Sequence, residues 1–532
     1  MTFLSILVDA TQWQPDEVSE TLDSISQQDL GGIEIIVVTR TKTTGFQTKI
    51  SVGKSAVRVT TIVDDSLDAR AGDGWIRGLE AATGIYVMLI RAGDRLKEGG
   101  LRVVERAIVA HGLQSASQVD VLYGDDVDWS EGGKAHIRRK PAWSPELLRS
   151  RDYIGIAAIF RTELIRTGVD VLDLDLQCGL YDLTLRITEV ADVVIHVPNT
   201  LLKIGSQTAQ AMARGGNDVL FVQQHCDRIG IDAKVEALAG VGVQRVRRRW
   251  NTFPRVSIII PTRGKELTAW GERRPAIIHC LRSIVEHTTW PNLEFVIVAD
   301  EATDEHVINS LREITELPMT VITYREAFNF SRKINLGAMS ATGEYFVLLN
   351  DDTVVKEPSW VQDLLGPLRE DDVGMTGAKL LYSDSTIQHG GQFWCEDPGH
   401  LLVGLQSHKA GYLDSARISR ECSGVTAACA AVRRDVFFSI GGMTELLPVN
   451  FNDVDFSLKI RAKGLRIVWV ADACLWHFES STREPSVDPS ELEFLRRRWG
   501  TQLVSDPYLV LENLQPSSRP HFGLKHKVSA WR

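Results

Sequence analysis

The chain repeats itself once, and this repeat limits its fold more than any other feature. AATGIYVMLIRAGDRL (81–96) aligns with SATGEYFVLLNDDTVV (340–355), and at the same offset of 259 residues VLYGDD (121–126) falls on LLYSDS (380–385). Similarity at a long fixed period indicates two copies of one structural unit. A chain of 532 residues also exceeds what one hydrophobic core supports, about 250–300 residues. We therefore expect two tandem domains.

Further segments continue the alignment through both copies. The matching pairs are LSILVDAT (4–11) with VSIIIPTR (256–263), IEIIVVTR (33–40) with LEFVIVAD (293–300), and YDLTLRI (181–187) with VDFSLKI (454–460). The last pair has an offset of 273, so the second copy contains about 14 extra residues, which we expect in a loop near 392–421.

Buried strands and helices alternate along the second copy. Four apolar runs bounded by turn residues predict strands, namely VSIIIPT, LEFVIVAD, MTVITYR and EYFVLLN. PAIIHCLRSIVEH and FNFSRKINLGAMSA, which lie between them, have the spacing of amphipathic helices. This βαβα order predicts an α/β fold with a mostly parallel, Rossmann-like sheet and helices on both faces. In such sheets ligands bind beyond the carboxyl ends of the strands.

The repeat also sets the expected domain boundaries. We predict a first α/β domain at 1–243, a linker at 244–255, a second α/β domain at 256–500 and a C-terminal extension at 501–532.

Composition excludes several classes of protein. The formal charge is 59 − 69 = −10, which argues against a nucleic-acid partner. No GxGxxG follows a strand, and VGKS at 52–55 lacks the P-loop glycine because position 48 is Thr48. A dinucleotide dehydrogenase and a P-loop ATPase are therefore disfavoured.

Cysteine usage and the apolar pattern indicate the compartment. The seven cysteines form no CxxC pair, so neither a disulfide framework nor a zinc site is predicted. The start lacks a secretory signal, and no uncharged apolar run reaches 18 residues. We expect a cytoplasmic protein. The tail HFGLKHKVSAWR (521–532) mixes aromatic and basic residues, which leaves contact with the inner face of the plasma membrane open.

A pair of carboxylates ends the predicted strand in GEYFVLLNDDTVV. Asp351 and Asp352 follow this strand directly, where they could hold Mg²⁺ or Mn²⁺ through oxygen. The alternative is a polar turn, since aspartate favours turns.

Two later segments add to this site. FNDVDFSLKIRAKG (451–464) predicts a helix with Asn452 as its N-cap and with Asp453 and Asp455 in the first turn. Residues two apart on a helix point away from each other, so only one of these carboxylates is expected to face a cleft. LRIVWVADACLWHFESS predicts a strand that ends near His477, as a ligand or as a packed bystander.

Residues 256–500 resemble family 2 glycosyltransferases of the GT-A fold, of the kind that builds bacterial surface polysaccharides such as O-antigen. The blocks that carry the resemblance are VSIIIPTRG, FNFSRKINLGA, YFVLLNDDT, GAKLLYSDSTIQHGG, AACAAVRRDVFFSIGGM, FNDVDFSLKIRAKGLRIVW and HFESSTR, in that family's order. The resemblance implies a nucleoside-diphosphate-sugar donor, a glycan or lipid-linked acceptor, a divalent cation (Mn²⁺ or Mg²⁺) and an inverting transfer.

The resemblance also implies residue roles. Asp351 and Asp352 match the DxD-type metal motif, with Asp352 the stronger ligand candidate, Asp453 matches the general base, and His477 matches a third metal ligand. The positions that match the nucleotide-sugar site are Pro261, Thr262, Arg263, Asp300, Arg332, Lys333, Asn335 and Asp351. The candidates for acceptor binding are Trp394, Trp476 and Asp455. The two tryptophans could equally belong to the core.

The first copy lacks these groups. The residues that align with Asp300, Asp351, Asp352, Asp453 and His477 are Arg40, Ala92, Gly93, Leu180 and Ile204. Asp94 and GDDVD (124–128) leave a displaced metal site open, although a polar turn is the simpler interpretation. RKPAWSPELLRSRDYIG (139–155) resembles the first module of tandem polysaccharide transferases, in which an acidic motif stands where RAGD stands here. We expect a degenerate, non-catalytic first module that supports the second or grips the growing glycan.

Three rivals to an inverting glycosyltransferase remain open. A polymerase with two active modules would need a substitute metal site in the first copy, and a glycan-binding scaffold would not need the acidic set of the second. A nucleotidyltransferase would need a glycine-rich loop after the first strand, which IIIPTRGKELTAWGERRP does not provide.

Overall fold

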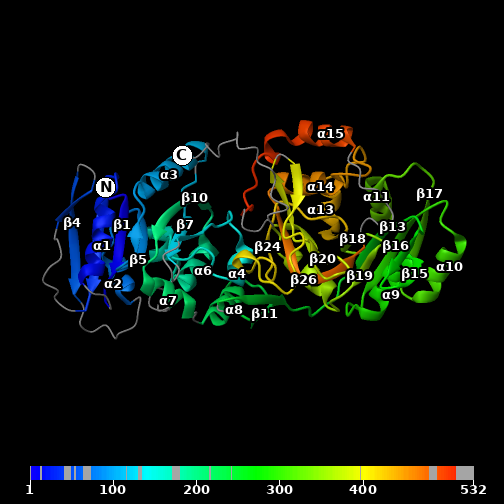
Figure 1. Cartoon of the computed structure of the whole chain (residues 1–532), viewed down its shortest axis with the longest axis horizontal. Coiled ribbons are helices and arrows are strands. Elements are labelled where there is room, and N and C mark those ends of the chain that lie inside the picture. The colour runs from blue at the N-terminus through cyan, green and yellow to red at the C-terminus, as the bar shows by residue number, and fades with distance from the viewer. Residues whose placement is uncertain are drawn as a thin grey trace. The chain divides into compact units, whose positions relative to one another are not determined.

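The structure is a computed structural model that describes residues 2–11, 15–40, 49–52, 55–63, 73–115, 117–129, 135–169, 180–214, 217–240, 242–395, 397–478 and 488–510. The basic tail at 521–532 lies outside the described residues. The chain divides into two compact units: unit 1 comprises Met1–Ser144 and Leu148–Val246, and unit 2 comprises Pro145–Leu147 and Arg247–Arg532 (Figure 1).

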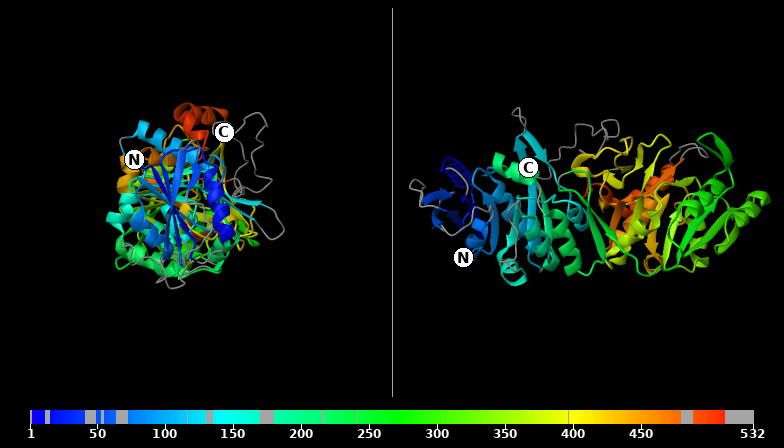
Figure 2. Two further views of the ribbon diagram at one scale, coloured as in Figure 1. Left: turned by 90° about the vertical axis from the view of Figure 1, so that its left-hand side faces the viewer. Right: turned by 90° about the horizontal axis from the view of Figure 1, so that it is seen from below.

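Unit 1 is built around one sheet with the strand order β3-β4-β2-β1-β5-β9-β7-β10-β6, and β8 pairs with β7. The strands are β1 Leu4–Asp9, β2 Ile33–Thr39, β3 Lys49–Val52, β4 Ser55–Val63, β5 Tyr86–Arg91, β6 Arg95–Leu96, β7 Val121–Trp129, β8 Ala135–Arg138, β9 Ala158–Arg161 and β10 Val194–Lys203. The helices are α1 Pro15–Ser26, α2 Asp73–Ala81, α3 Gly100–Gln114, α4 Pro145–Ser150, α5 Thr162–Gly168, α6 Tyr181–Val190, α7 Ser206–Arg214 and α8 Asp218–Arg228. The left view of Figure 2 shows the twisted strands of this unit, in blue, beside α1.

Part of the expected linker is a strand. Gln244–Arg248 form β12, which pairs with β11 (Ala233–Ala237) in a two-stranded sheet.

Unit 2 is built around a sheet with the order β17-β16-β13-β18-β25-β20-β26-β19, to which β21 and β24 add at the sides. The strands are β13 Val256–Thr262, β14 Glu266–Ala269, β15 Glu272–Pro275, β16 Leu293–Asp300, β17 Met319–Tyr324, β18 Tyr345–Leu349, β19 Thr353–Val355, β20 Val373–Leu381, β21 Ile387–His389, β22 Gln392–Cys395, β23 Asp397–His400, β24 Arg420–Glu421, β25 Cys429–Arg433 and β26 Arg466–His477. The helices are α9 Ala276–His287, α10 Glu305–Ile314, α11 Phe330–Ser340, α12 Trp360–Leu365, α13 Arg434–Ser439, α14 Asn452–Ala462 and α15 Pro489–Trp499.

Alternate residues of the central strands explain the layers of unit 2. In β18, Val347 and Leu349 belong to the core that includes α9, α10 and α12, whereas Phe346 and Leu348 belong to the core that includes α11, α13 and α14. Side chains of a strand point alternately to its two faces, so a strand buried on both sides reads as a continuous apolar run. Figure 1 shows helices on both sides of this sheet.

The two sheets share one topology. When the sheets are followed in spatial order, from β4 to β6 in unit 1 and from β17 to β19 in unit 2, each strand of one unit has a counterpart at the same position in the other. The pairings agree as well, because β9 and β25 run antiparallel to both neighbours while β7–β10 and β20–β26 are parallel. The prediction of two tandem, mostly parallel α/β units is confirmed.

The alignment of VLYGDD with LLYSDS is wrong by five residues. Val121 pairs with Phe160 in unit 1, and Met375 pairs with Val432 at the same place in unit 2. The equivalent of Val121 is therefore Met375, because hydrogen-bond register fixes equivalence more strictly than a short similarity of composition.

One glutamate ties three segments together in each unit. Glu294 accepts hydrogen bonds from Ser257 Oγ at 2.5 Å, from Thr342 N at 2.6 Å and from Gly343 N at 3.2 Å. Unit 1 repeats this arrangement around Glu34, whose donors are Ser5, Thr83 and Gly84. Burial raises the pKa of both carboxyls, but these hydrogen bonds outweigh it and hold the pKa below its ordinary value.

Candidate active site

The acidic pair lies in the turn between β18 and β19. Asp351 accepts a hydrogen bond of 2.6 Å from Thr262 Oγ1, at the carboxyl end of the neighbouring strand β13. Burial and the adjacent Asp352 raise the pKa of Asp351 to about 7. The two carboxylates therefore have different surroundings, and Asp351 faces the end of β13.

Asp352 meets His477 across a strand pair. Thr353, the first residue of β19, pairs with His477, the last residue of β26. Asp352 Oδ1 lies 3.1 Å from His477 Nε2 and has no hydrogen-bond donor of its own. Burial raises the pKa of Asp352, but the His477 imidazole outweighs burial and holds the pKa below its ordinary value. The structure thus brings together two of the predicted metal ligands.

Gln388 sets the tautomer of His477. Its side-chain oxygen lies 2.6 Å from His477 Nδ1, and its side-chain nitrogen donates to the His477 carbonyl at 3.4 Å. An amide oxygen can only accept, so Nδ1 carries a proton, and Nε2 is the nitrogen whose lone pair a cation would use. Asn350 Nδ2 donates to that same Nε2 at 3.2 Å. His477 Nε2 therefore lies beside both Asn350 Nδ2 and Asp352 Oδ1.

These donors fit a divalent cation in chemistry. A buried carboxylate oxygen of Asp352 and an imidazole nitrogen of His477 lie 3.1 Å apart, and both kinds of group are common ligands of Mn²⁺. A histidine ligand whose other nitrogen donates to a fixed acceptor is the usual supporting arrangement. In the described part of the chain, however, no three His, Cys, Asp or Glu side chains are grouped to hold an ion.

A second polar cluster lies at the carboxyl ends of β13 and β16. Lys333 Nζ, fully buried, donates to Asp300 Oδ1 at 2.8 Å and to the carbonyl of Thr262 at 2.8 Å. Burial lowers the pKa of this lysine more than Asp300 raises it. Arg263 Nε lies 3.3 Å from Asp300 Oδ2, and its guanidinium lies 5.6 Å from the exposed Phe328 ring. Pro261 is buried in β13 beside them.

Two of the predicted donor-site residues bind the loop that precedes α14. Arg332 Nε donates to Glu445 at 2.8 Å, and Asn335 Nδ2 donates to the Met443 carbonyl at 2.9 Å and to Glu445 at 3.2 Å. Asn335 Oδ1 also accepts from Met443 N at 2.8 Å. Glu445, which sequence reasoning missed, therefore anchors the segment before α14 to helix α11.

The two aspartates of DVD have different surroundings. Asp453 is partly exposed, and its Oδ2 accepts from Gln392 Nε2 at 3.1 Å. The Asp455 side chain is completely buried and accepts from Thr444 Oγ1 at 2.6 Å and from Trp499 Nε1 at 2.8 Å. As expected from their spacing, only Asp453 is open to a ligand. The acceptor-binding role of Asp455 is wrong, because this carboxylate fastens α15 to α14.

The helix that carries them begins one residue away from the expected cap. Asn452 is its first residue, and the N-cap position belongs to Phe451, whose φ is 57°. The Asn452 side chain instead donates to the Val449 carbonyl at 3.3 Å. Asn452 is therefore not the N-cap.

The two candidate tryptophans also have different positions. Trp394 is 0% exposed and packs with Val454, Leu458 and Leu495, so its predicted role in acceptor binding is wrong. Trp476 is half-buried, and the exposed Trp270, at the tip of the β14–β15 hairpin, packs edge-on against it at 5.0 Å. Trp476 stays a candidate.

In unit 1, the turn equivalent to the one that carries Asp351 and Asp352 is held by hydrogen bonds to Asp94. Asp94 accepts from Gly205 N at 2.8 Å, from Arg91 N at 2.9 Å and from Thr208 Oγ1 at 3.1 Å, and burial raises its pKa to about 6. Buried Arg91, which aligns with Asn350, lies 4.7 Å from the Trp75 ring.

GDDVD lies in strand β7 and is not a turn. Asp126 pairs with Arg138 at 2.6 Å and with Lys140 at 2.9 Å, and Asp125 lies 3.1 Å from His196. Two cations balance this cluster, which argues against a displaced metal site.

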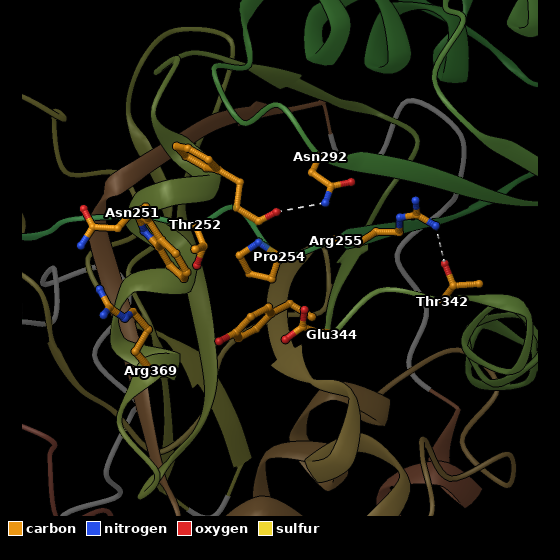
Figure 3. A pocket seen from close by; sticks show the side chains of 11 residues that line it. Asn251, Thr252, Pro254, Arg255, Asn292, Thr342, Glu344 and Arg369 are labelled. Carbon is orange, nitrogen blue, oxygen red and sulfur yellow. Dashed lines mark hydrogen bonds between the residues drawn. The ribbon is translucent and has the colours of Figure 1, made fainter.

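A cavity of about 720 Å³ lies at the opposite edge of the unit 2 sheet. Trp250, Phe253 and Tyr345 line it, where β13 and β18 begin. Figure 3 shows Pro254, Arg255 and Glu344 around the same cavity. Figure 3 also shows Arg255 donating to Thr342 Oγ1, at 3.3 Å. The cavity is separate from the carboxylates, which lie where these strands end.

Comparison with known proteins bears on unit 2 first. Residues 257–441 match the model of the glycosyl transferase family 2. None of the helices in the described ranges is both long enough and apolar enough to cross a membrane.

Two relatives match most of the chain. The O-antigen biosynthesis protein RfbC of Myxococcus xanthus is 29% identical over 95% of this chain and 39% of its own length. An uncharacterized protein of Sinorhizobium fredii is 29% identical over 81% of this chain and 48% of its own length. The chain therefore spans less than half the length of either relative. Among solved structures, the mannosyltransferase PcManGT of Pyrobaculum calidifontis, in complex with GDP-Man and Mn²⁺, is 17% identical over 46% of this chain and 69% of its own, with a TM-score of 0.32.

Proposed function

We propose that the chain, whose residues 257–441 match the model of glycosyl transferase family 2, is an inverting glycosyltransferase of cell-surface polysaccharide synthesis. It moves a sugar from a nucleoside-diphosphate-sugar to a glycan or lipid-linked acceptor. The relative that acts in O-antigen biosynthesis supports this setting.

One observation carries the proposal: Asp352 Oδ1 and His477 Nε2, two groups of the kind that hold a divalent cation, lie 3.1 Å apart. Gln388, which contacts His477, and Gln392, which contacts Asp453, are four residues apart. Their Cα atoms are therefore at most about 14 Å apart, because an extended chain spans roughly 3.3–3.6 Å per residue. This short spacing supports the proposal that the cation site and Asp453 act on one substrate.

The chemistry follows from these positions. Asp453 would accept the proton of the attacking hydroxyl as general base, which typically accelerates a reaction about 10²–10⁴-fold. A divalent cation held by Asp352 and His477, with Asp351 beside them, would neutralise charge on the leaving diphosphate. With a base on one side of the sugar and the leaving group on the other, a single displacement inverts the anomeric carbon.

The cluster around Lys333 would hold the nucleoside part of the donor. Asp300 and Arg263 present polar groups at its rim, and the exposed Phe328 ring offers a stacking face. Arg332 and Asn335 would act indirectly, because both bind the Glu445 segment.

Unit 1 is proposed to be non-catalytic and to support unit 2 or grip the glycan. Its support is the replacement of the carboxylate pair by Ala92 and Gly93, together with the full set of hydrogen bonds around Asp94.

A donor panel tests the proposal. UDP-, dTDP- and GDP-sugars would be compared for thermal stabilisation and hydrolysis with Mn²⁺, with Mg²⁺ and without metal. A ligand at 100 times its Kd stabilises the folded state by about 2.7 kcal/mol, so one sugar-nucleotide should raise Tm only when metal is present. Asp352→Ala should abolish that shift. Equal stabilisation of wild type and variant would contradict the cation site.

A further inference from the structure

We propose that the segment Gln388–Gln392 is a positioning element for the transfer, in which Gln388 orients His477 and Gln392 orients Asp453. The proposal rests on the function above and extends it to two residues that touch neither the reacting atoms nor the cation. Both glutamines are buried, with 3% and 2% of their surface exposed. One amide therefore supports the leaving-group side and the other supports the base.

Hydrogen bonds from several directions hold this segment. His389 Nε2 accepts from Thr426 N at 3.3 Å, and the Gly390 carbonyl accepts from the buried guanidinium of Arg420. Gln392 N donates to the Gly424 carbonyl at 2.7 Å. A buried backbone tied at successive residues has little freedom to shift, so the two amides are fixed relative to each other.

The glycines allow the tight turn between β21 and β22. Gly391 has φ 99°, a conformation that residues with a Cβ rarely adopt. A Cβ on Gly390 would lie 2.8 Å from the Leu402 side chain and 2.9 Å from the Leu401 carbonyl. Only this short, glycine-containing turn lets two glutamines four residues apart reach His477 and Asp453.

Gln388 acts through the proton on His477 Nδ1. With its oxygen at 2.6 Å, it keeps a proton there, so that Nε2, which lies 3.1 Å from Asp352 Oδ1, is the nitrogen that would bind the cation. Loss of such a supporting acceptor typically weakens metal binding about 10–100-fold. Gln388→Ala should therefore weaken Mn²⁺ binding by that factor, whereas Gln388→Glu, which still accepts from Nδ1–H, should retain most of it.

Gln392 acts on the acceptor side. Its Nε2 holds Asp453 Oδ2 at 3.1 Å, which fixes the carboxylate against the hydroxyl it would deprotonate. Gln392→Ala should lower kcat for transfer about 10-fold or more and leave Mn²⁺ affinity and donor KM unchanged. Gln392→Glu puts a second negative charge beside Asp453, so the acidic limb of the pH–rate profile should move to higher pH.

The first experiment needs no metal. In protein labelled with ¹⁵N-histidine, long-range ¹H–¹⁵N spectra report the tautomer of each ring, and His477→Ala identifies the His477 signal. Wild type should show the Nδ1-protonated form, and Gln388→Ala should lose that preference. An unchanged tautomer in Gln388→Ala overturns the role of Gln388, whatever the metal result.

The second experiment measures Mn²⁺ alone by the electron paramagnetic resonance signal of the free ion. Gln388→Ala should weaken binding in wild type but have no further effect in the His477→Ala background. A further loss in that background would contradict action through His477. Failure of wild type to bind Mn²⁺ would count against the cation site of the proposed function, while the tautomer result would still decide the role of Gln388.

Gln28 provides a matched control in unit 1. It is 1% exposed, and its Nε2 donates to the carbonyls of Ser24 and Lys97, each at 3.0 Å. Gln28→Ala removes a buried glutamine of the same kind and should change neither Mn²⁺ affinity nor kcat. Equal losses of activity in Gln28→Ala and Gln392→Ala would assign the effect of Gln392 to general destabilisation and overturn its positioning role.

Discussion

Asp453→Asn and Asp455→Asn should have opposite effects although the two residues are neighbours in one helical turn. The Asp455 carboxylate is fully buried, with Thr444 Oγ1 at 2.6 Å, Trp499 Nε1 at 2.8 Å and Arg498 at 3.2 Å. Asp453 is partly exposed and accepts from Gln392. The pair therefore separates a chemical role from a structural one.

The magnitudes follow from these contacts. A hydrogen bond to a charged group contributes about 1.5–3 kcal/mol, and asparagine can still accept one of the two bonds at position 455. We expect Asp455→Asn to lower the free energy of unfolding by about 2–4 kcal/mol, a large share of a typical 5–15 kcal/mol. Asp453→Asn should change stability by less than about 1 kcal/mol and reduce transfer about 10²–10⁴-fold.

Calorimetric unfolding and transfer assays would be run on both variants. Asp453→Asn should keep the wild-type Tm and donor affinity while transfer nearly disappears. Asp455→Asn should melt earlier and regain most of its specific activity at low temperature, where it is folded. Strong transfer by Asp453→Asn would refute the base, and an unchanged Tm for Asp455→Asn would refute the assignment of that carboxylate to the core.

Three further outcomes follow from buried groups. Trp394→Ala should cost about 3–5 kcal/mol of stability and leave the acceptor KM of the folded fraction unchanged, which denaturant unfolding and kinetics would measure. The lowered pKa of Glu34 and Glu294 means that their stabilising effect is complete above the ordinary value of 4.5 and is lost as pH falls through the folded-state pKa. Each Glu→Gln variant should therefore melt earlier than wild type at pH 7 and approach it below pH 4.5, and a gap that persists at low pH would contradict the carboxylate's role. Lys333→Met removes the donor to Asp300 and should weaken sugar-nucleotide binding at least about 10-fold, near 1.4 kcal/mol, by calorimetric titration; unchanged affinity would exclude this cluster from the donor site.

The sheet and the meeting of Asp352 with His477 could be predicted from sequence for one reason. Apolar runs mark buried strands, and in a Rossmann-like sheet the groups that follow strands gather at one edge. Asp351, Asp352 and His477 all lie at the carboxyl ends of predicted strands. The internal repeat also aligned β6 of unit 1 with β19 of unit 2, and the observed pairing of these two strands agrees with that alignment.

The remaining site residues depend on tertiary packing, which leaves no periodic trace in the sequence. Trp394 is buried because α14 and the segment after α15 close over it, and Glu445 reaches α11 only through the path of its loop. Gln388 lies in IQHGG (387–391), a block noted for its resemblance alone, and Gln392 directly follows it. An amide side chain gains a positioning role only when the fold places a hydrogen-bonding partner opposite it. The spacing of residues in the sequence therefore could not reveal that role.

The two units show which parts of this fold are needed for folding and which for chemistry. Both keep the glutamate that ties three segments, because its carboxylate accepts from a serine hydroxyl and from two consecutive backbone N–H groups at once. At the place of Asp352, unit 1 has Gly93 with φ 93°, a backbone that an aspartate would strain. The next residue, Asp94, holds Gly205 and Thr208 at the start of α7. Reinstating two carboxylates in unit 1 would therefore not rebuild the turn of unit 2, since the backbone itself has been committed to another set of hydrogen bonds.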